Sequence, residues 1–374
     1  MPHGLRFVFF SQSLISDWNH GNAHFLRGVV SELLSLGHEV RVLEPLHGWS
    51  LQSLRRERGD AAVQAFNQAF PRLRSTFYDP ATLDLDRALD GANVVIVHEW
   101  TPPELIAMLG RHRALKRTYK LLFHDTHHRI VSAPQEMRAL DMSHYDGVLA
   151  FGETLRGCYE RLESAPRAWT WHEAADTRVF RPLAGLEKPL DLIWVGNWGD
   201  GERSRELMEY LIDPVRDLGL RARVYGVRYP AEAIRALGEA GIEYGGWVAN
   251  FRVPALFACS RVTVHVPRRF YREQLPGIPT IRMFEALACR MPLVTAPWED
   301  SEGLFTPGRD YLVAHDGGEM RRHLKQLLDD PPFAAALAER GYRAVLRRHT
   351  CAHRVQELLG ICRELGVGEL SHVA

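Results

Sequence analysis

The residues best suited to chemistry follow two apolar runs in the first half of the chain. Residues 93–97 are followed by His98, and residues 119–123 are followed by His124 and Asp125. Ligands of an open parallel sheet gather at the carboxyl ends of its strands, so both runs would deliver polar side chains to that edge. An imidazole there can position a hydroxyl group or accept its proton. We therefore predict that His124, Asp125 and His98 are catalytic and that His124 and Asp125 point into a cleft rather than into a core.

Two alternatives apply to this histidine-rich segment. Histidines at strand ends can be capping groups that are satisfied inside the fold. The spacing of His124, His127 and His128 also raises zinc binding, but no cysteine or distant carboxylate pattern matches it. Asp84 and Asp86 resemble a metal-binding Asp-x-Asp pair, yet they fall in a polar helix start and not at the end of an apolar strand. We predict no metal site.

A second candidate site surrounds a glutamate in the C-terminal half. A helix is expected between Pro279 and Pro292, because Thr280 suits a helix start and apolar residues recur at helical spacing. Arg282 and Glu285 lie one turn apart on it. The carboxylate can accept hydrogen bonds from two sugar hydroxyls while the helix N-terminus faces an anion. The simpler alternative is that the macrodipole favours an acid near a helix start.

A glycine-rich turn predicts an anion site upstream of this helix. Residues 191–195 form an apolar run that leads into Gly196 and Asn197, and a helix is expected from residue 202. Such a strand, turn and helix N-terminus present backbone N–H groups to a phosphate. A guanidinium group such as that of Arg203 would stabilise a departing nucleoside diphosphate without a metal, unless it is only a surface residue.

The first apolar run, residues 5–10, leads into a polar loop with His20, Gly21 and Asn22 before a helix over residues 23–36. The loop lacks Gly-x-Gly-x-x-Gly, so a nicotinamide dinucleotide site is disfavoured.

Residues 49–70 are expected to form one amphipathic helix with a charged middle, Arg55 to Arg58. A solvated face is the ordinary explanation of such a run, and contact with an acceptor or a membrane is the alternative.

The overall composition limits the classes of partner. The chain has 374 residues, of which 46% are apolar, enough for two domains with separate cores. Lys plus Arg equals Asp plus Glu at 46 each, so charge gives no reason to expect nucleic acid, although a local basic patch and a peripheral membrane contact remain open. Five scattered cysteines, and no leader or membrane-spanning run, predict a cytoplasmic protein.

Four ordered segments carry a family resemblance: residues 244–248, 253–267, 282–295 and 305–311. Together they resemble the C-terminal domain of group 1 glycosyltransferases of the GT-B fold, and most of all the branch similar to the spore-maturation protein CgeB. The ordered match spans roughly residues 190–360 and is more specific than any one of its pieces. In the wider family a Glu-x7-Glu pair flanks the helix start. Glu285 matches the second glutamate, and Gly277 stands at the first position.

The resemblance implies an α/β protein with two Rossmann-like, doubly wound parallel-sheet domains facing a cleft. We expect an N-terminal acceptor-side domain at residues 1–176, a linker at 177–189 and a nucleotide-sugar-binding domain at 190–349. A C-terminal helix within residues 350–374 would cross back to the first domain.

The implied activity is transfer of a sugar from a nucleotide diphosphate sugar, such as a UDP-sugar, to a hydroxyl of a glycan, lipid-linked or small-molecule acceptor. It implies retention at the anomeric carbon and no metal or other cofactor. His20, Gly21 and Asn22 would face phosphate and acceptor. The donor-binding residues would be Glu285, Arg282, Gly196, Asn197, Arg203, Trp247, Val248, Arg268, Thr280 and Ile281, with Trp247 and Val248 bordering the base. The alternatives are a sugar-nucleotide epimerase of the same architecture and a binding protein without catalysis.

Overall fold

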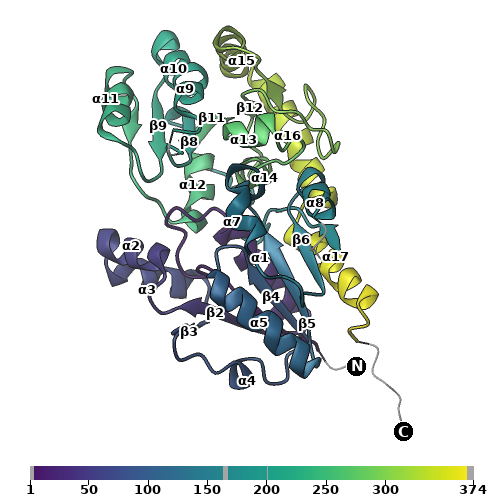
Figure 1. Cartoon of the computed structure of the whole chain (residues 1–374). Coiled ribbons are helices and arrows are strands. Elements are labelled where there is room, and N and C mark those ends of the chain that lie inside the picture. The colour runs from purple at the N-terminus through teal and green to yellow at the C-terminus, as the bar shows by residue number, and fades with distance from the viewer. Residues whose placement is uncertain (1–3, 163–166, 200, 369–374) are drawn as a thin grey trace. The chain divides into compact units, whose positions relative to one another are not determined.

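The computed structural model describes residues 4–162, 167–199 and 201–368, and it divides into two compact units (Figure 1). Unit 1 consists of Met1–Glu173 and Cys351–Ala374, and unit 2 consists of Ala174–Thr350. Each unit is built on one parallel sheet, as the predicted fold class requires. Unit 2 begins at Ala174, so residues 177–189, expected to be a linker, lie within it.

The sheet of unit 1 has the strand order β3-β2-β1-β4-β5-β6-β7 in the described part of the chain. Its central strands are rich in β-branched and aromatic residues and are buried on both faces, which explains their nearly continuous apolar sequences. The strands are β1 (Arg6–Phe10), β2 (Glu39–Pro45), β3 (Ser75–Tyr78), β4 (Val94–His98), β5 (Lys120–Asp125), β6 (Gly147–Ala150) and β7 (Ala168–Thr170).

Helices connect these strands. They are α1 (Ala23–Ser35), α2 (Trp49–Arg58), α3 (Asp60–Ala69), α4 (Leu85–Ala88), α5 (Pro103–Lys116), α6 (Arg129–Ser132), α7 (Pro134–Arg138) and α8 (Glu153–Glu160). The single helix predicted over residues 49–70 is wrong, because the chain breaks at Gly59 between α2 and α3. Gly59 has φ +65°, a left-handed conformation that glycine adopts without a side-chain clash.

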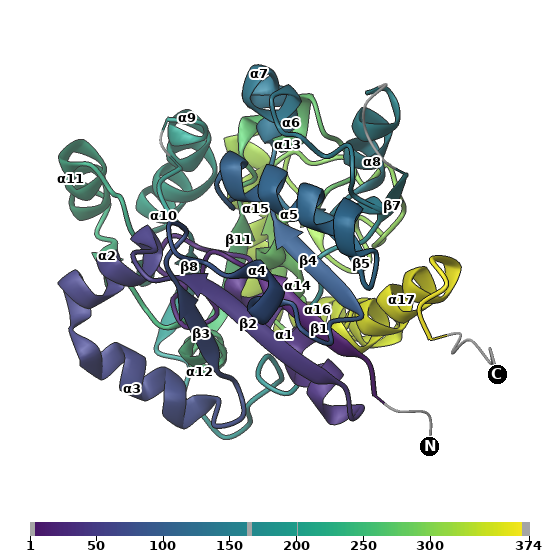
Figure 2. The same cartoon turned by 60° about the horizontal axis from the view of Figure 1, so that its bottom comes forward.

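The last helix, α17 (Cys351–Glu364), belongs to unit 1 although the whole of unit 2 precedes it. It packs beside α1, and Figure 2 shows the two helices together. The indole Nε1 of Trp171 donates a hydrogen bond to the carbonyl of Arg354 at 2.8 Å. Arg167 forms an ion pair with Glu364 at 2.7 Å. These contacts tie α17 to the end of the unit 1 sheet.

The sheet of unit 2 has the order β10-β9-β8-β11-β12-β13 among the described residues. Its strands are β8 (Leu190–Val195), β9 (Ala222–Tyr225), β10 (Glu243–Tyr244), β11 (Ser260–His265), β12 (Leu293–Thr295) and β13 (Leu312–Val313). The helices are α9 (Ser204–Leu207), a π-helical turn η1 (Met208–Ile212), α10 (Asp213–Leu218), α11 (Ala231–Glu239), a 3-10 turn η2 (Asn250–Arg252), α12 (Val253–Ala258), α13 (Arg269–Glu273), α14 (Ile281–Ala288), α15 (Gly317–Asp329) and α16 (Pro331–Arg348).

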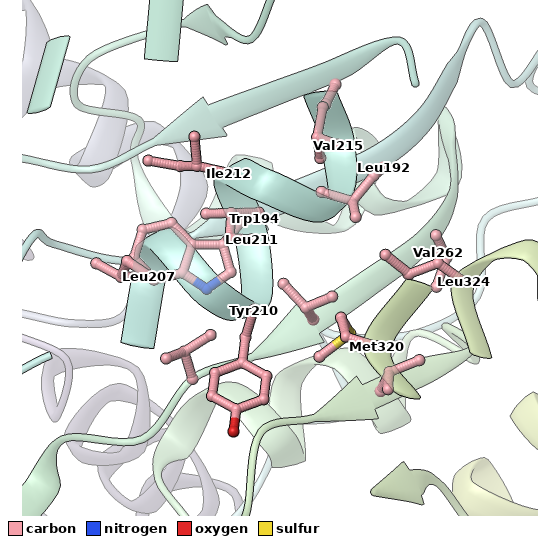
Figure 3. Close-up of a cluster of buried hydrophobic side chains, with 14 of the residues drawn as sticks. Leu192, Trp194, Leu207, Tyr210, Leu211, Ile212, Val215, Val262, Met320 and Leu324 are labelled. Carbon is pink, nitrogen blue, oxygen red and sulfur yellow. The ribbon is translucent and has the colours of Figure 1, made fainter. Parts of the chain in front are cut away.

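The core of unit 2 lies between the sheet and the helices that cover it. Figure 3 shows Leu192 and Trp194 of β8 directed toward the segment from α9 to α10, with Val262 of β11 beside Leu324 of α15. Burial of each such side chain contributes about 1.5–3 kcal/mol of stability. This core fixes the strands whose carboxyl ends form the candidate site.

None of the helices in the described ranges is both long and apolar enough to cross a bilayer.

Candidate functional site

The carboxyl edge of the unit 2 sheet is formed where β8 and β9 end side by side. Gly196 donates its N–H to the carbonyl of Tyr225 at 2.8 Å, and Tyr229 donates its hydroxyl to the carbonyl of Gly196 at 2.9 Å. A Cβ added at Gly226 would lie 2.0 Å from the oxygen of Gly196. Only glycine fits that approach, so the turn predicted at Gly196 depends on a second glycine in the neighbouring strand exit.

Arg203 spans this edge. Its guanidinium donates to the carbonyl of Val266 at 2.8 Å and to that of Asn197 at 2.5 Å, and it stacks over the ring of Trp194 at 5.2 Å. Its Nε is buried and has no hydrogen-bond partner in the part of the chain that the structure describes. Burial, followed by the charge of Arg268, lowers the pKa of Arg203 to about 9, so the side chain remains cationic at neutral pH. Arg203 is therefore a fixed positive charge between two strand exits.

Two further arginines lie close enough to act on the charge of Arg203. Arg268 forms an ion pair with Glu202 at 2.6 Å, and Arg282 forms one with Glu285. Both arginines lower the pKa of Arg203 through like-charge repulsion. The three arginines and two glutamates give the group a net charge of +1. We call Gly196, Asn197, Arg203, His265, Arg268, Thr280 and Arg282 the edge site.

His265 belongs to the edge site, although the sequence analysis did not select it. Its ring lies between two hydroxyls, with Nδ1 2.9 Å from Thr295 Oγ1 and Nε2 3.0 Å from Thr280 Oγ1. Burial, then the charge of Arg203, lowers its pKa to about 3, so the imidazole is neutral. The sequence did contain a signal for this residue, because His265 ends an apolar strand just as His98 does.

Thr280 and Ile281 lie at the start of α14. Thr280 occupies the N-cap position, but its side chain contacts His265 and makes no capping hydrogen bond to the helix. The side chain of Ile281 is 5% exposed and belongs to the core.

Glu285 is fully buried in α14. Asn250 donates to its Oε1 at 2.7 Å, and Arg282 donates to its Oε2. The macrodipole alternative is not supported, because the first turn of α14 contains no acid and the dipole acts mainly within that turn. Asn250 and Arg282 are both protein side chains, so binding of sugar hydroxyls by this carboxylate stays a prediction.

Trp247 and Val248 follow β10 and are both partly buried. The preceding residue, Gly246, accepts a hydrogen bond from the N–H of Gly226 at 2.9 Å. This contact ties the segment predicted to border the base to the exit of β9.

Unit 1 gathers four predicted residues around one small cavity: His20, Asn22, His98 and His124. The cavity volume is about 10 Å³, room for one water molecule or one hydroxyl group. His98 Nε2 lies 2.9 Å from Asn22 Nδ2 and 3.0 Å from Thr126 Oγ1. Within the described residues, Asn22 Oδ1 and His124 Nε2 are buried without a hydrogen-bond partner. The cavity can therefore bind a single polar group.

The predicted orientation of His124 is wrong. Its side chain packs inside unit 1, with its ring centroid 4.8 Å from that of Trp171 and 6.0 Å from that of Phe25. Burial lowers the pKa of His124 to about 3, and burial together with the charges of His124 and His20 lowers that of His98 well below its usual value. Both imidazoles are thus neutral.

The predicted orientation of Asp125 is also wrong. Its side chain is fully buried and accepts hydrogen bonds from the hydroxyl of Tyr159 at 2.7 Å and the N–H of His127 at 3.0 Å. Burial raises the pKa of Asp125 to about 6. It is not among the residues that line the cavity.

Glu44 holds the loop that carries His20, Gly21 and Asn22, and sequence reasoning missed it. Its carboxylate accepts hydrogen bonds from Ser13 Oγ at 2.7 Å, from the N–H groups of Leu14 and Ile15 at 2.6 and 3.2 Å, and from Ser75 Oγ. A buried carboxylate with four donors fixes the loop backbone. Gly21 lies exposed at the turn before α1.

Across residues 4–162, 167–199 and 201–368, no group of three or more His, Cys, Asp or Glu side chains is arranged to hold a metal ion.

Residues 203–360 match the family model described as "Glycosyl transferase-like". No curated protein matches the sequence. Sucrose-phosphate synthase from Thermosynechococcus elongatus superimposes with a TM-score of 0.68 at 14% identity, covering 97% of this chain and 99% of that chain. HepE from Anabaena, in complex with UDP and glucose, gives a TM-score of 0.68 at 12% identity, covering 96% and 100%. An α-glucosyltransferase in complex with UDP-glucose and DNA containing an abasic site gives a TM-score of 0.69 at 12% identity, covering 96% of this chain and 100% of that chain.

These similarities over nearly the whole of each chain confirm that the fold is that of GT-B glycosyltransferases, with two parallel-sheet α/β domains.

The buried neutral state of His265 predicts a pH-dependent stability. The unfolded chain protonates this residue near pH 6.5 and the folded chain near pH 3, so stability is lost as the pH falls through that window. Between pH 7.5 and 5 the loss attributable to His265 is about 2 kcal/mol. Urea unfolding at both pH values should show a smaller loss for His265→Asn than for wild type. His315 is exposed, and the control variant His315→Asn should lose as much stability between the two pH values as wild type does. An equal loss in all three proteins would contradict the assignment.

Proposed function

We propose that this chain is a glycosyltransferase that moves a sugar, most simply a hexose, from a UDP-sugar or a related nucleoside diphosphate sugar to an acceptor hydroxyl. The observation that carries the proposal is the edge site, where Arg203 bonds to a glycine-rich strand exit and Arg268 and Arg282 lie close enough to act on its charge. The segment that matches a glycosyl transferase-like family contains all three arginines. Solved proteins of the same fold have structures with UDP or UDP-glucose.

The edge site suits the leaving group of such a reaction. The bond between the anomeric carbon and the diphosphate oxygen breaks, a bond to the acceptor oxygen forms, and the proton of the acceptor hydroxyl passes to the departing diphosphate. Negative charge grows on the departing diphosphate, where a fixed cation stabilises it without reorganisation. Arg203 is such a cation because two backbone carbonyls hold its guanidinium. Glu202 and Glu285 orient the other two arginines. On this basis we propose that no metal ion is needed.

The cavity of unit 1 suits a hydroxyl group. Ser11 Oγ, Asn22 Oδ1 and His124 Nε2 are its buried polar atoms without a hydrogen-bond partner in the described structure, and His98 also lines the cavity. A base is most effective when its pKa is near the working pH, and burial lowers the pKa of both histidines far below that. We therefore assign His98 and His124 to positioning a substrate hydroxyl rather than to holding its proton.

The finer features of the proposal come from the sequence resemblance. They are retention at the anomeric carbon, ribose binding by Glu285, the CgeB-like branch, and an acceptor that is a glycan, a lipid-linked sugar or a small molecule. A cytoplasmic location is proposed on a different ground, the five scattered cysteines. The equal numbers of acidic and basic residues support an acceptor other than nucleic acid.

Loss of Arg203 should weaken nucleotide binding. Arg203→Ala should raise the dissociation constant of UDP by about 10–100-fold, because a hydrogen bond to a charged group contributes about 1.5–3 kcal/mol. Calorimetric titration with UDP provides the measurement, and circular dichroism checks the fold. The exposed Arg205, two residues away, supplies the control Arg205→Ala. The assignment fails if both folded variants bind UDP as wild type does.

Donor turnover should not depend on a divalent cation. We expect release of UDP from UDP-glucose, with water or a screened acceptor, to change by less than about twofold after treatment with EDTA. Chromatography of the products separates transfer or hydrolysis from epimerisation. Activity that disappears in EDTA and returns with manganese or magnesium would contradict the arginine-based account, and UDP binding without any turnover would favour a binding protein.

His98 should affect turnover and not donor affinity. His98→Asn removes a group beside the cavity, and we expect the rate of UDP release to fall about 100-fold with UDP affinity unchanged. Asp125→Asn is the contrasting variant: it should lower thermal stability but keep turnover, because Asp125 bonds to Tyr159 away from the cavity. Loss of turnover in Asp125→Asn with full activity in His98→Asn would contradict this assignment. Asp125 would then be the residue needed for turnover, and His98 would be structural.

A further inference from the structure

A groove with a volume of about 640 Å³ lies at the amino ends of the unit 2 strands, and the edge site lies at their carboxyl ends. Lys188 precedes β8, Arg261 is near the start of β11, and Pro292 precedes β12, so one wall is formed by the amino ends of these strands. The other wall consists of residues from α15 and α16. Small-molecule sites typically have volumes of about 300–1,000 Å³. The groove is large enough for a ligand and is separated from the edge site by the length of the strands.

The charge of the groove is unbalanced. Its lining contains four cations, Lys188, Arg261, Arg290 and Arg343, and one acid, Glu339. That acid is shared, because Arg290 and Arg343 both form ion pairs with it. Four positive charges and one negative charge leave an excess of three on the lining. A concave surface with one sign of charge concentrates ligands of the opposite sign.

Lys188 and Arg261 are the least compensated of these cations. Arg261 Nη1 lies 3.6 Å from Asp191, but Asp191 already accepts two hydrogen bonds from the side chain of Arg221 at 3.1 Å. Within the described ranges, Lys188 has no ion-pair partner. Although Lys188 is largely exposed, partial burial, followed by the charge of Arg261, lowers its pKa. A bound anion would relieve this repulsion.

The floor of the groove is apolar. Leu327 of α15 and Ala334 and Ala338 of α16 are buried beneath it, and Ala335 is exposed on it. Three alanines at this position leave the space open, since larger side chains would fill it. The helix α16 begins at Pro331 on the rim, and Asp330 caps its N-terminus by accepting a hydrogen bond from the N–H of Phe333 at 3.0 Å, so the excess positive charge of the groove comes from the four side chains. The groove therefore offers cations beside an apolar surface.

We propose that this groove binds a phosphate ester with an apolar substituent, its phosphate against Lys188 and Arg261 and its alkyl part over the alanines of α16. The site is distinct from the proposed donor site and does not depend on the transferase activity. Charge complementarity selects the anion, and the alanine floor selects an ester over inorganic phosphate. The ester is either a soluble molecule or the headgroup of an anionic lipid, since both present the same chemistry.

Hexyl phosphate is the probe, titrated against the full chain by calorimetry below its micelle concentration. We expect saturable binding, with inorganic phosphate at least about tenfold weaker and neutral hexanol without measurable heat. Lys188→Glu and Ala335→Glu should each weaken hexyl phosphate binding by about tenfold or more. Both sites are exposed, so the variants should fold.

Two controls locate the binding. Arg235→Glu reverses an exposed charge on α11, outside the groove lining, and should keep the wild-type affinity. Arg203→Ala, in the edge site, should also keep the wild-type affinity for hexyl phosphate, so failure of the donor proposal leaves this test intact.

Co-sedimentation with vesicles of phosphatidylglycerol or phosphatidylcholine identifies the source of the ester. Binding to phosphatidylglycerol that is lost in Lys188→Glu indicates a lipid headgroup, and binding of hexyl phosphate alone indicates a soluble ester. Non-saturable titration, or equal affinity in wild type and Lys188→Glu, would overturn the proposal.

Discussion

The hydrogen bonds that the partly buried Arg203 guanidinium donates to two backbone carbonyls are the interaction on which the edge site depends. Partial burial of a cation is costly unless its N–H groups are paired, and the carbonyls of Val266 and Asn197 each accept one hydrogen bond from the Nη atoms. Those carbonyls belong to the exits of β8 and β11, so satisfying the cation also fixes the spacing of two strand exits. The close approach of Gly226 to Gly196 adds the third exit. The geometry of the edge site is thus a consequence of pairing the N–H groups of this cation with backbone carbonyls at the sheet edge.

The two units handle polar groups at their sheet edges in opposite ways. Unit 2 concentrates charge, with three arginines near one another. The cavity of unit 1 is lined by neutral imidazoles, since His20, His98 and His124 all have lowered pKa values because of burial, with His20 at about 4. A cationic site suits a diphosphate, and a cavity with neutral polar groups suits a hydroxyl group. This difference agrees with the proposed transfer, which has one anionic and one uncharged substrate.

The sequence predicted the fold class and the strand ends because these follow from local patterns of apolar residues. It did not predict the partners of the buried polar groups. Asp125 bonds to Tyr159, Glu285 to Asn250 and Glu44 to Ser13, and each pair is separated by more than 30 residues. Such pairings depend on which helix packs against which strand end, and no local pattern records that. The prediction of a single helix over residues 49–70 was wrong for a local reason. The apolar spacing continues through this segment, but Gly59 ends one helix and begins the next.

The place of α17 in unit 1 has a consequence for the order of folding. During synthesis the residues of unit 1 up to Glu173 emerge first, yet the helix that packs on α1 emerges only after all of unit 2. Until then the indole of Trp171 lacks the Arg354 carbonyl and the neighbouring face of α1 lacks its cover. Domains generally fold as units as they leave the ribosome, but this first domain cannot be completed before the second has been made. The nascent chain therefore carries α1 without its partner helix for most of its translation.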